Sequence, residues 1–282
     1  MKIVGYDQIV ESLKMLGIKR GDVLLVHSAL TAVGYVQGGP DAVIDALLDT
    51  VGPEGTVVMS TLTMWDAPFD AVNTKSAVGI ISERFRNRPG VLRSLHPVHS
   101  VAAKGAKAEY ITKGHDNCPT GCGEGTPYMK IAELSGKIML LGVDMDRNTM
   151  MHTLEELADA RYLLTLTIPA PLYPPYDGQG TFTLNKFPPG HRDFLHITSK
   201  LMQEGVMTEG MIGGAVTKVI DARGLLDTAL PLLKQDPLYF ICENEHCNFC
   251  RFARNLYAQD EQMIHTDNRC KDPVCEICVL PS

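Results

Sequence analysis

The sequence predicts an α/β fold in which a mixed central sheet is flanked by helices. Apolar runs with the length of buried strands stand at residues 22–28, 56–63 and 136–144, and segments with helical spacing of apolar residues alternate with them. The chain of 282 residues is 45% hydrophobic, which is enough to bury a large core. We expect residues 1–240 to form this domain and residues 241–282 to form a small cysteine-rich tail.

The first half of the domain begins with a short amphipathic helix at residues 7–16, followed by the first buried strand. A glycine-containing loop then leads to Pro40 and Asp41, which suit the first turn of a helix. Gly52 and Pro53 end that helix. We expect the second strand and the next helix at residues 56–63 and 76–88.

In the second half, Pro127 suits the first position of another helix. The apolar run at residues 136–144 predicts a strand buried on both faces, and Asn148 or Thr149 can cap the helix that follows it. Residues 180–187 are interpreted as a hairpin-like local insertion. The order of elements therefore favours one domain with helices on both faces of a sheet.

The helix expected after residue 148 carries a histidine and a carboxylate one turn apart. His152 and Glu155 share a helix face because they are three residues apart. Glu155 can hold the imidazole in one tautomer and favour the imidazolium formed when the ring takes a proton. A solvated surface pair is the alternative that spacing alone leaves open. The strand before the helix favours a general base, since ligands bind at the carboxyl ends of strands in open α/β sheets.

Charge and composition exclude some classes of function. The net charge of −7 argues against a nucleic-acid-binding protein and is compatible with a cationic substrate. No apolar run reaches the ~18 residues that span a bilayer, and residues 1–7 lack the apolar core of a signal peptide. We expect a cytoplasmic protein with neither a membrane nor a nucleic-acid partner, and an oligomer stays open.

Four groups of short motifs occur in a fixed order along the chain. They are Val26-His27-Ser28 with Gly38-Gly39, Arg93-Ser94-Leu95-His96-Pro97 with Ser100, Pro119-Thr120-Gly121 with Gly125-Thr126-Pro127, and Leu140-Leu141-Gly142-Val143 with Asn148-Thr149 and His152-Glu155. This ordered set resembles the aminoglycoside 3-N-acetyltransferase family, the antibiotic N-acetyltransferase type, which is distinct from GNAT enzymes. The resemblance covers about residues 1–240, and it likens Gly210–Ala215 to the start of a late helix.

The resemblance implies an antibiotic-resistance acyltransferase that moves an acetyl group from acetyl-CoA to a primary amine of an aminoglycoside-like acceptor. It places the catalytic base on His152 and the supporting carboxylate on Glu155. The chemistry agrees, because an ammonium group cannot attack a thioester until a base removes a proton. The resulting oxyanion needs a donor, and Thr63 or Ser100 is a candidate that would also lie at the cofactor.

The resemblance also implies that the loop after the first strand lies along CoA. His27, Ser28, Gly38 and Gly39 are the residues concerned. A helix N-terminus after this loop offers backbone N–H groups to a phosphate, although the two glycines suit backbone shape alone. The chain has no GxGxxG or GxxxxGK[ST] motif, so neither a dinucleotide site nor a P-loop is indicated.

A cationic acceptor calls for carboxylates, which pair with ammonium groups. Asp66 and Asp70 follow the second strand, beside Trp65, which suits a pocket wall. Glu156 follows the proposed catalytic pair. We therefore expect Asp66, Asp70 and Glu156 to contact the acceptor, with Glu124 and Asp193 as further candidates.

The tail carries a repeated cysteine motif. Cys242, Cys247 and Cys250 recur as Cys270, Cys275 and Cys278, each 28 residues further on. Two C-x2-C pairs are a common way to build a tetrahedral zinc site. The first choice of ligands is therefore Cys247, Cys250, Cys275 and Cys278, and such a site would stabilise a tail too small to fold alone. Three alternatives stay open: Cys242 and Cys270 could take part in a two-metal cluster, the cysteines could hold an iron–sulfur cluster, or His246 or His265 could be a ligand.

Two other interpretations depend on cysteines and histidines of the domain. Cys118 and Cys122 lack a recognisable triad and are expected to be small buried thiols, although a thiol-dependent hydrolase would need one of them. His96 and His99 could converge on a metal ion, but Pro97 between them and the lack of a third ligand nearby argue against it, and His96-Pro97 is interpreted as a structural turn shared with the family. A further alternative is a CoA-binding or regulatory protein on the same scaffold, whose zinc tail recruits a partner.

Overall fold

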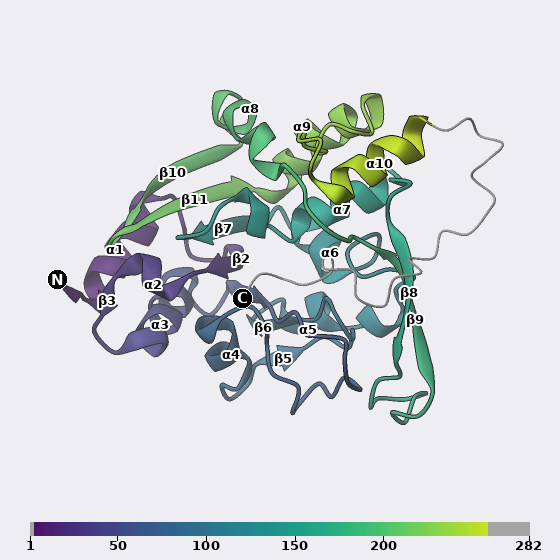
Figure 1. Cartoon of the computed structure of the whole chain (residues 1–282). Helices are drawn as coiled ribbons and strands as arrows, with labels where there is room; N and C mark the ends of the chain where they lie inside the picture. Colours follow the sequence, from purple (N-terminus) through teal and green to yellow (C-terminus); the bar gives the residue numbers. More distant parts are fainter. Residues whose placement is uncertain (1–2, 259–282) are drawn as a thin grey trace.

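The computed structural model describes residues 3–258, and its centre is a seven-stranded sheet with helices on both faces (Figure 1). The strand order is β10-β11-β7-β2-β4-β6-β5. The strands of this sheet are β2 Val23–Ser28, β4 Thr56–Ser60, β5 Leu92–Arg93, β6 Val101–Gly105, β7 Lys137–Leu141, β10 Met207–Ile212 and β11 Ala215–Asp221. Two further sheets have two strands each: β1 Ile3–Val4 with β3 Tyr35–Val36, and β8 Leu164–Pro169 with β9 Thr181–Phe187.

The helices alternate with these strands. They are α1 Tyr6–Met15, α2 Leu30–Val33, α3 Gly39–Val51, α4 Ile80–Arg86, α5 Ala108–Thr112, α6 Pro127–Glu133, α7 Met150–Leu157, α8 Thr198–Gln203, α9 Ala222–Gln235 and α10 Asn248–Ala258, with short 3₁₀ turns η1 His115–Asn117, η2 Met145–Arg147 and η3 Phe194–Ile197. Pro127 occupies the first turn of α6, and Asp41 lies in the first turn of α3, as expected.

Parallel and antiparallel pairs are both present in the sheet, which confirms the predicted mixed sheet. β2 pairs in parallel with β4 and β7, so that Leu25 lies opposite Val58 on one side and Ile138 on the other. β6, β11 and the edge strands pair antiparallel. Three parallel strands therefore end at the same edge of the sheet.

The sheet separates two hydrophobic cores. Successive side chains of a strand point to opposite faces, so Leu25 packs with helices α5 to α9 and Leu24 packs with α1 to α4. Both side chains are fully buried. Burial on both faces explains why these strands are continuous apolar runs in the sequence.

The direction of chain connection reverses at β2. From β2 the chain passes through α3 to β4 on one side, whereas α6 leads into β7 on the other side of β2. α3 and α6 also cover opposite faces of the sheet. Such a switch point leaves a crevice at the carboxyl ends of the strands, where ligands of open α/β sheets bind. The residues after β2, β4 and β7 are therefore the candidates for a site.

One expected element is wrong. Gly210–Ala215 does not start a helix but lies in the antiparallel hairpin of β10 and β11, in which Ile212 pairs with Ala215. Exposed Met211 alternates with buried Ile212, which is the period of a strand. The turn requires glycine at position 213, because its φ is 61° and a Cβ there would lie 2.6 Å from the Val33 carbonyl oxygen.

Three predicted segments differ in their bounds. The helix expected at 76–88 is limited to α4, and the strand expected at 56–63 ends at Ser60. Thr61 and Thr63 still donate main-chain hydrogen bonds to the Ser100 and Val98 carbonyls, but no regular ladder continues there. The insertion at 180–187 is β9, and its partner strand is β8, on the far side of a long loop.

Part of the cysteine-rich tail packs on the main domain. Phe249 and Cys250 of α10 form a third apolar cluster with Ala160 and Tyr162, which follow α7. Cys270, Cys275 and Cys278 lie outside the described residues, so the four-cysteine site stays a prediction. Among residues 3–258, no helix combines the length and the apolar character that crossing a bilayer requires.

Candidate active site

Helix α7 is positioned by the residues between it and β7. Asp144 accepts a hydrogen bond from the Met145 N–H at 2.7 Å, which starts the turn η2. Asn148 Oδ1 then accepts from the Met150 N–H at 3.2 Å, whereas the Thr149 side chain makes no cap bond. Of the two predicted capping residues, Asn148 therefore performs this role.

His152 and Glu155 face each other on α7. His152 Nδ1 lies 2.7 Å from Glu155 Oε2. Because a carboxylate only accepts, Nδ1 carries the proton and Nε2 keeps its lone pair. The His152 side chain is 23% exposed and that of Glu155 is fully buried. The geometry is that of a partly accessible base with a buried orienting carboxylate.

The second oxygen of Glu155 is held by a residue that the sequence analysis missed. Arg192 Nε donates to Glu155 Oε1, and both side chains are almost completely buried. Burial alone would raise the pKa of Glu155, but the charges of Arg192 and His152 outweigh it and hold that pKa below its ordinary value. Glu155 is therefore an ionised carboxylate. Arg192 lies 37 residues from Glu155 in a loop, where no periodic spacing signals it.

Buried imidazoles line one side of the site. The His99 ring is 6.5 Å from the His152 ring, centre to centre. His96 stacks on His115 at 4.7 Å, and its Nδ1 accepts from the main-chain N–H groups of Val98 and His99. Burial lowers the pKa of His99 and of His115 to about 3. These rings are therefore neutral, and His96-Pro97 begins a turn, as expected.

Arg93 organises the loop after β4. Its guanidinium donates to the main-chain carbonyls of Thr61, Ala71 and Thr74 at 3.0, 3.2 and 2.5 Å. Burial lowers the pKa of Arg93 to about 10, which still leaves it charged at neutral pH. This one side chain therefore holds both ends of the segment that contains Asp66 and Asp70.

Thr63 and Ser100 lie in this loop region with their hydroxyl protons engaged. Thr63 Oγ1 donates to the Pro97 carbonyl, and Ser100 Oγ donates to the Thr61 carbonyl at 2.8 Å. A hydroxyl has one proton to donate. Donation by either residue to an oxyanion would thus require that its present hydrogen bond be broken.

The residues expected along CoA lie at the end of β2 and the start of α3. Ser28 is the last residue of β2, and His27 is buried beside it with no hydrogen-bond partner for Nε2 among the described residues. Gly38 and Gly39 have φ values of 85° and 62°. Gly38, the N-cap residue of α3, has no side chain that could cap the helix. The N–H groups of the first turn, apart from that of Pro40, which has none, are therefore available to an anion.

Asp66 and an aromatic wall lie beside the buried histidines. Asp66 is exposed next to Trp65, whose ring makes an edge contact with Phe187 at 5.1 Å. Phe187 in turn lies 6.2 Å from the His99 ring. The contacts form a continuous path from Asp66 to His152.

The other predicted acceptor carboxylates have partners or lie at the surface. Asp70 accepts from Asn73, which lowers the pKa of its carboxyl. Glu156 is buried and accepts from the Cys122 N–H at 3.0 Å, and burial raises its pKa to about 7. Glu124 is exposed, and Asp193 is half-buried.

The surroundings of Cys118 and Cys122, the two cysteines of the domain, favour the protonated thiol of each. Cys122 is fully buried, and burial followed by the charge of Glu156 raises the pKa of its thiol well above the usual range. Cys118 is half-buried and its thiol donates to the Gly114 carbonyl. Both therefore remain thiols, which fits the expectation of inert packing groups.

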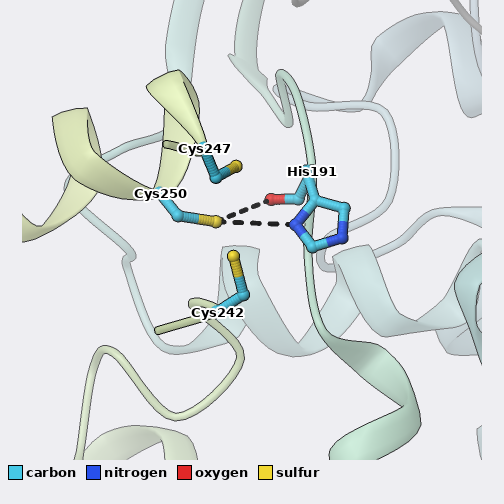
Figure 2. A group of neighbouring side chains, drawn as sticks. All are labelled: His191, Cys242, Cys247 and Cys250. Carbon is cyan, nitrogen blue, oxygen red and sulfur yellow. Dashed lines mark hydrogen bonds between the residues drawn. The ribbon is translucent and has the colours of Figure 1, made fainter. Parts of the chain in front are cut away.

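A cluster of possible metal ligands lies where the tail meets the domain. Figure 2 shows Cys242, Cys247 and Cys250 around His191, with one ligand atom from each within 4.8 Å of the others. Cys242, Cys247 and Cys250 were predicted as ligands, whereas His191 was not. His191 lies in a loop that is distant in sequence from the cysteine repeat, so the spacing of the cysteines could not identify it.

A family model described as aminoglycoside 3-N-acetyltransferase matches residues 25–234, which is well over half of the chain. The chain belongs to this family. It is therefore an acyltransferase, as the ordered motifs predicted. The matched range contains the seven-stranded sheet from Leu25 of β2 onward, together with His152, Glu155 and Arg192, and it ends before the cysteines of the tail.

Curated members of the aminoglycoside 3-N-acetyltransferase family match over most of their length. Aminoglycoside N(3)-acetyltransferase IV of a Salmonella species is 32% identical over 239 residues, which cover 83% of this chain and 89% of the relative. Aminoglycoside N(3)-acetyltransferase VII of Streptomyces paromomycinus is 29% identical, with coverage of 81% and 91%.

Solved structures of the family confirm the fold. A histidine-to-alanine variant of AAC(3)-IVa in complex with gentamicin superimposes with a TM-score of 0.83 at 30% identity, covering 90% of this chain and 98% of that chain. AAC-IIIb with CoASH gives a TM-score of 0.75 at 30% identity, with coverage of 83% and 97%. The central mixed sheet with flanking helices is thus the aminoglycoside 3-N-acetyltransferase fold.

Proposed function

We propose that this protein transfers an acetyl group from acetyl-CoA to a primary amine of an aminoglycoside-like acceptor, with His152 as the general base. The 2.7 Å contact between His152 Nδ1 and Glu155 Oε2 carries the proposal. It leaves Nε2 as the proton acceptor of a partly exposed side chain. The relative solved with gentamicin as a histidine-to-alanine variant agrees with a histidine of importance at an aminoglycoside site.

In the proposed reaction the acceptor ammonium first releases one proton to solvent, and His152 Nε2 then takes a second proton from the neutral amine as its nitrogen attacks the thioester carbonyl. The new C–N bond gives a tetrahedral oxyanion, and the C–S bond then breaks. The imidazolium returns its proton to the leaving thiolate, so that CoA is released as a thiol. Glu155 stabilises the imidazolium between these two transfers, since the carboxylate is ionised and in direct contact with the ring.

Acetyl-CoA is proposed to bind along the loop of His27, Ser28, Gly38 and Gly39. The uncapped N-terminus of α3 supports this assignment, because free N–H groups and the helix dipole both favour a phosphate. The family member solved with CoASH supports CoA as the ligand of this loop. Thr63 and Ser100 are placed near the thioester in this proposal, within the loop that Arg93 holds.

The acceptor is proposed to bind against Trp65 with Asp66 as its first carboxylate. Asp66 is exposed, and the aromatic contacts of Trp65 and Phe187 lead from it toward His152. Asp70 and Glu156 are proposed as additional acidic groups. Glu156 would contribute a full charge only above neutral pH, because burial raises its pKa to about 7.

The test is acceptor-dependent release of CoA, measured by mass spectrometry so that tail thiols do not interfere. His152→Ala is compared with His196→Ala, which removes an exposed histidine of η3. We expect loss of at least ~100-fold in kcat for His152→Ala, which is the scale of general base catalysis, and no loss for the control. Equal activity of both variants would contradict the assignment. Acetyl-CoA binding without release for any amine would support the regulatory alternative.

A further inference from the structure

The cysteine-rich tail and the main domain meet at four metal-ligating side chains. Cys247 and Cys250 lie at the first turn of α10, Cys242 lies on the segment before it, and His191 belongs to the loop between β9 and η3 (Figure 2). His191 precedes Cys250 by 59 residues. A chance surface grouping would not bring one histidine to three cysteines from so distant a segment, whereas a shared ion explains it.

The distances suit a tetrahedral zinc ion. Cys250 Sγ lies 3.6 Å from His191 Nδ1. With Zn–S bonds near 2.3 Å and Zn–N bonds near 2.0 Å, a sulfur and a nitrogen ligand of one zinc are ~3.6 Å apart and two sulfurs are ~3.8 Å apart. The four ligand atoms already lie within 4.8 Å of one another. Three thiolates and one imidazole fill all positions, as in structural zinc sites.

We propose that His191, Cys242, Cys247 and Cys250 bind one zinc ion, and that this ion positions Arg192 against Glu155. On binding, the three thiols release their protons to solvent and become ligands. The metal site stands independently of the reaction, whereas its effect on turnover rests on the proposed function. In this ligand set, His191 and Cys242 take the places of Cys275 and Cys278 in the four-cysteine prediction.

The ligands enclose Arg192 from two sides. Arg192 follows His191 directly, and its Nη1 donates to the His191 carbonyl at 3.0 Å. Phe249 stands between the ligands Cys247 and Cys250, and its ring centre is 4.2 Å from the guanidinium carbon of Arg192. An ion that joins α10 to the His191 loop therefore holds the main chain and the aromatic ring that surround this guanidinium.

The guanidinium of Arg192 connects the metal-ligand cluster to His152 through Glu155. Arg192 Nε donates to one oxygen of Glu155, and the other oxygen accepts from His152 Nδ1. Displacement of Arg192 would turn the carboxylate and with it the imidazole. Arg192 and the ion act through Glu155, so they are positioning groups. Their role is like that of residues that hydrogen-bond to metal ligands and fix the orientation of those ligands.

The metal is tested on the full chain by zinc content and by the absorption spectrum after replacement with Co²⁺, whose thiolate charge-transfer bands report the number of sulfur ligands. We expect His191→Ala and Cys250→Ser to lose one ion per chain. The matched control His246→Ala removes an exposed neighbouring histidine and keeps the ion. The double variant Cys275→Ser/Cys278→Ser also keeps it. Loss in the double variant with retention in His191→Ala would overturn the ligand set.

The coupling is tested by steady-state kinetics of the same variants. We expect His191→Ala to lower kcat about tenfold or more with the KM for acetyl-CoA nearly unchanged, in line with the 10- to 100-fold effects of orienting groups. His191→Cys supplies a fourth thiolate and should recover both the ion and kcat, even if the alanine variant folds poorly. Loss of the ion without loss of kcat would overturn the coupling. An inactive parent protein that still binds the ion would contradict the proposed function instead.

Discussion

Replacing Glu155 with glutamine removes the charge that joins His152 to Arg192. Both carboxylate oxygens are engaged, one with each partner, and the side chain is fully buried. An unpaired buried charge costs ~3–5 kcal/mol. Because a glutamine oxygen can still accept from Arg192, we expect Glu155→Gln to lower the free energy of unfolding by about 3 kcal/mol. The imidazole also loses its orienting anion, and kcat should fall by ~10²–10⁴-fold, the upper value matching such a change in a serine protease triad.

A double-mutant cycle with Arg192→Gln shows whether the loss of stability in Glu155→Gln comes from the buried charge pair of Glu155 and Arg192. Each single variant leaves one buried charge short of a partner, whereas the double variant leaves neither charge. We expect the double variant to be ~2–3 kcal/mol more stable than the sum of the single effects, at the upper end of couplings between contacting residues. Urea unfolding followed by circular dichroism measures these free energies, and CoA release measures kcat.

The control and the refuting result are both specific. Asp227→Asn removes the exposed pair with Arg223, and it should change the free energy of unfolding by less than ~1 kcal/mol. Strictly additive effects of Glu155→Gln and Arg192→Gln would show that the pair is not coupled. Unchanged kcat in Glu155→Gln would refute its role as the orienting anion of the base.

Burial holds the pKa values of the four buried histidines below the ordinary 6.5, near 4 for His27 and near 3 for two others. The unfolded state therefore binds more protons than the folded state below pH 6.5, so the free energy of unfolding is highest above this pH and should fall on acidification toward pH 4 by ~1.4 kcal/mol per pH unit for each histidine. Urea unfolding at pH 5 and pH 6.5 measures this slope, and the slope for His27→Gln should correspond to the uptake of one proton fewer on unfolding. Gly38→Ala should lower the free energy of unfolding by ~1–2 kcal/mol, since the φ of Gly38 is 85°, and it should raise the KM for acetyl-CoA about tenfold. The control Gly114→Ala, at a φ of 78°, should lower the free energy of unfolding by a similar amount and leave this KM unchanged. Phe249→Leu removes a ring over Arg192, and it should lower the free energy of unfolding by ~2 kcal/mol in thermal unfolding and lower kcat in turnover assays. Phe252→Leu at the surface should change neither quantity.

Periodicity made the proposed catalytic pair predictable, whereas it gave no signal for Arg192, which contacts Glu155. His152 and Glu155 are one helical turn apart, so the sequence alone brings them together. Arg192 approaches from a loop whose position depends on tertiary packing against Tyr162 and Phe249. The same holds for His191, since the spacing of the cysteines identifies ligands within the tail but says nothing of a partner from the domain.

The fold was predictable where burial leaves a simple pattern. Strands buried on both faces stand out as apolar runs, and Pro127 marks a helix start by its fixed φ. Gly213 and Gly214 were ambiguous, because glycines suit both a helix start and a two-residue hairpin turn. The alternation of exposed Met211 and buried Ile212 identifies the strand, but it is weak over so few residues.

The neutral histidines around His152 have an electrostatic consequence for the choice of substrate. A polycationic amine that approaches the site meets imidazoles that carry no charge at neutral pH, because burial lowers the pKa of His99 to about 3. The positive charge of Arg192 is offset by Glu155 in direct contact. The neutral ring of His99 therefore adds no positive charge beside His152 that would repel the ammonium groups of the proposed acceptor.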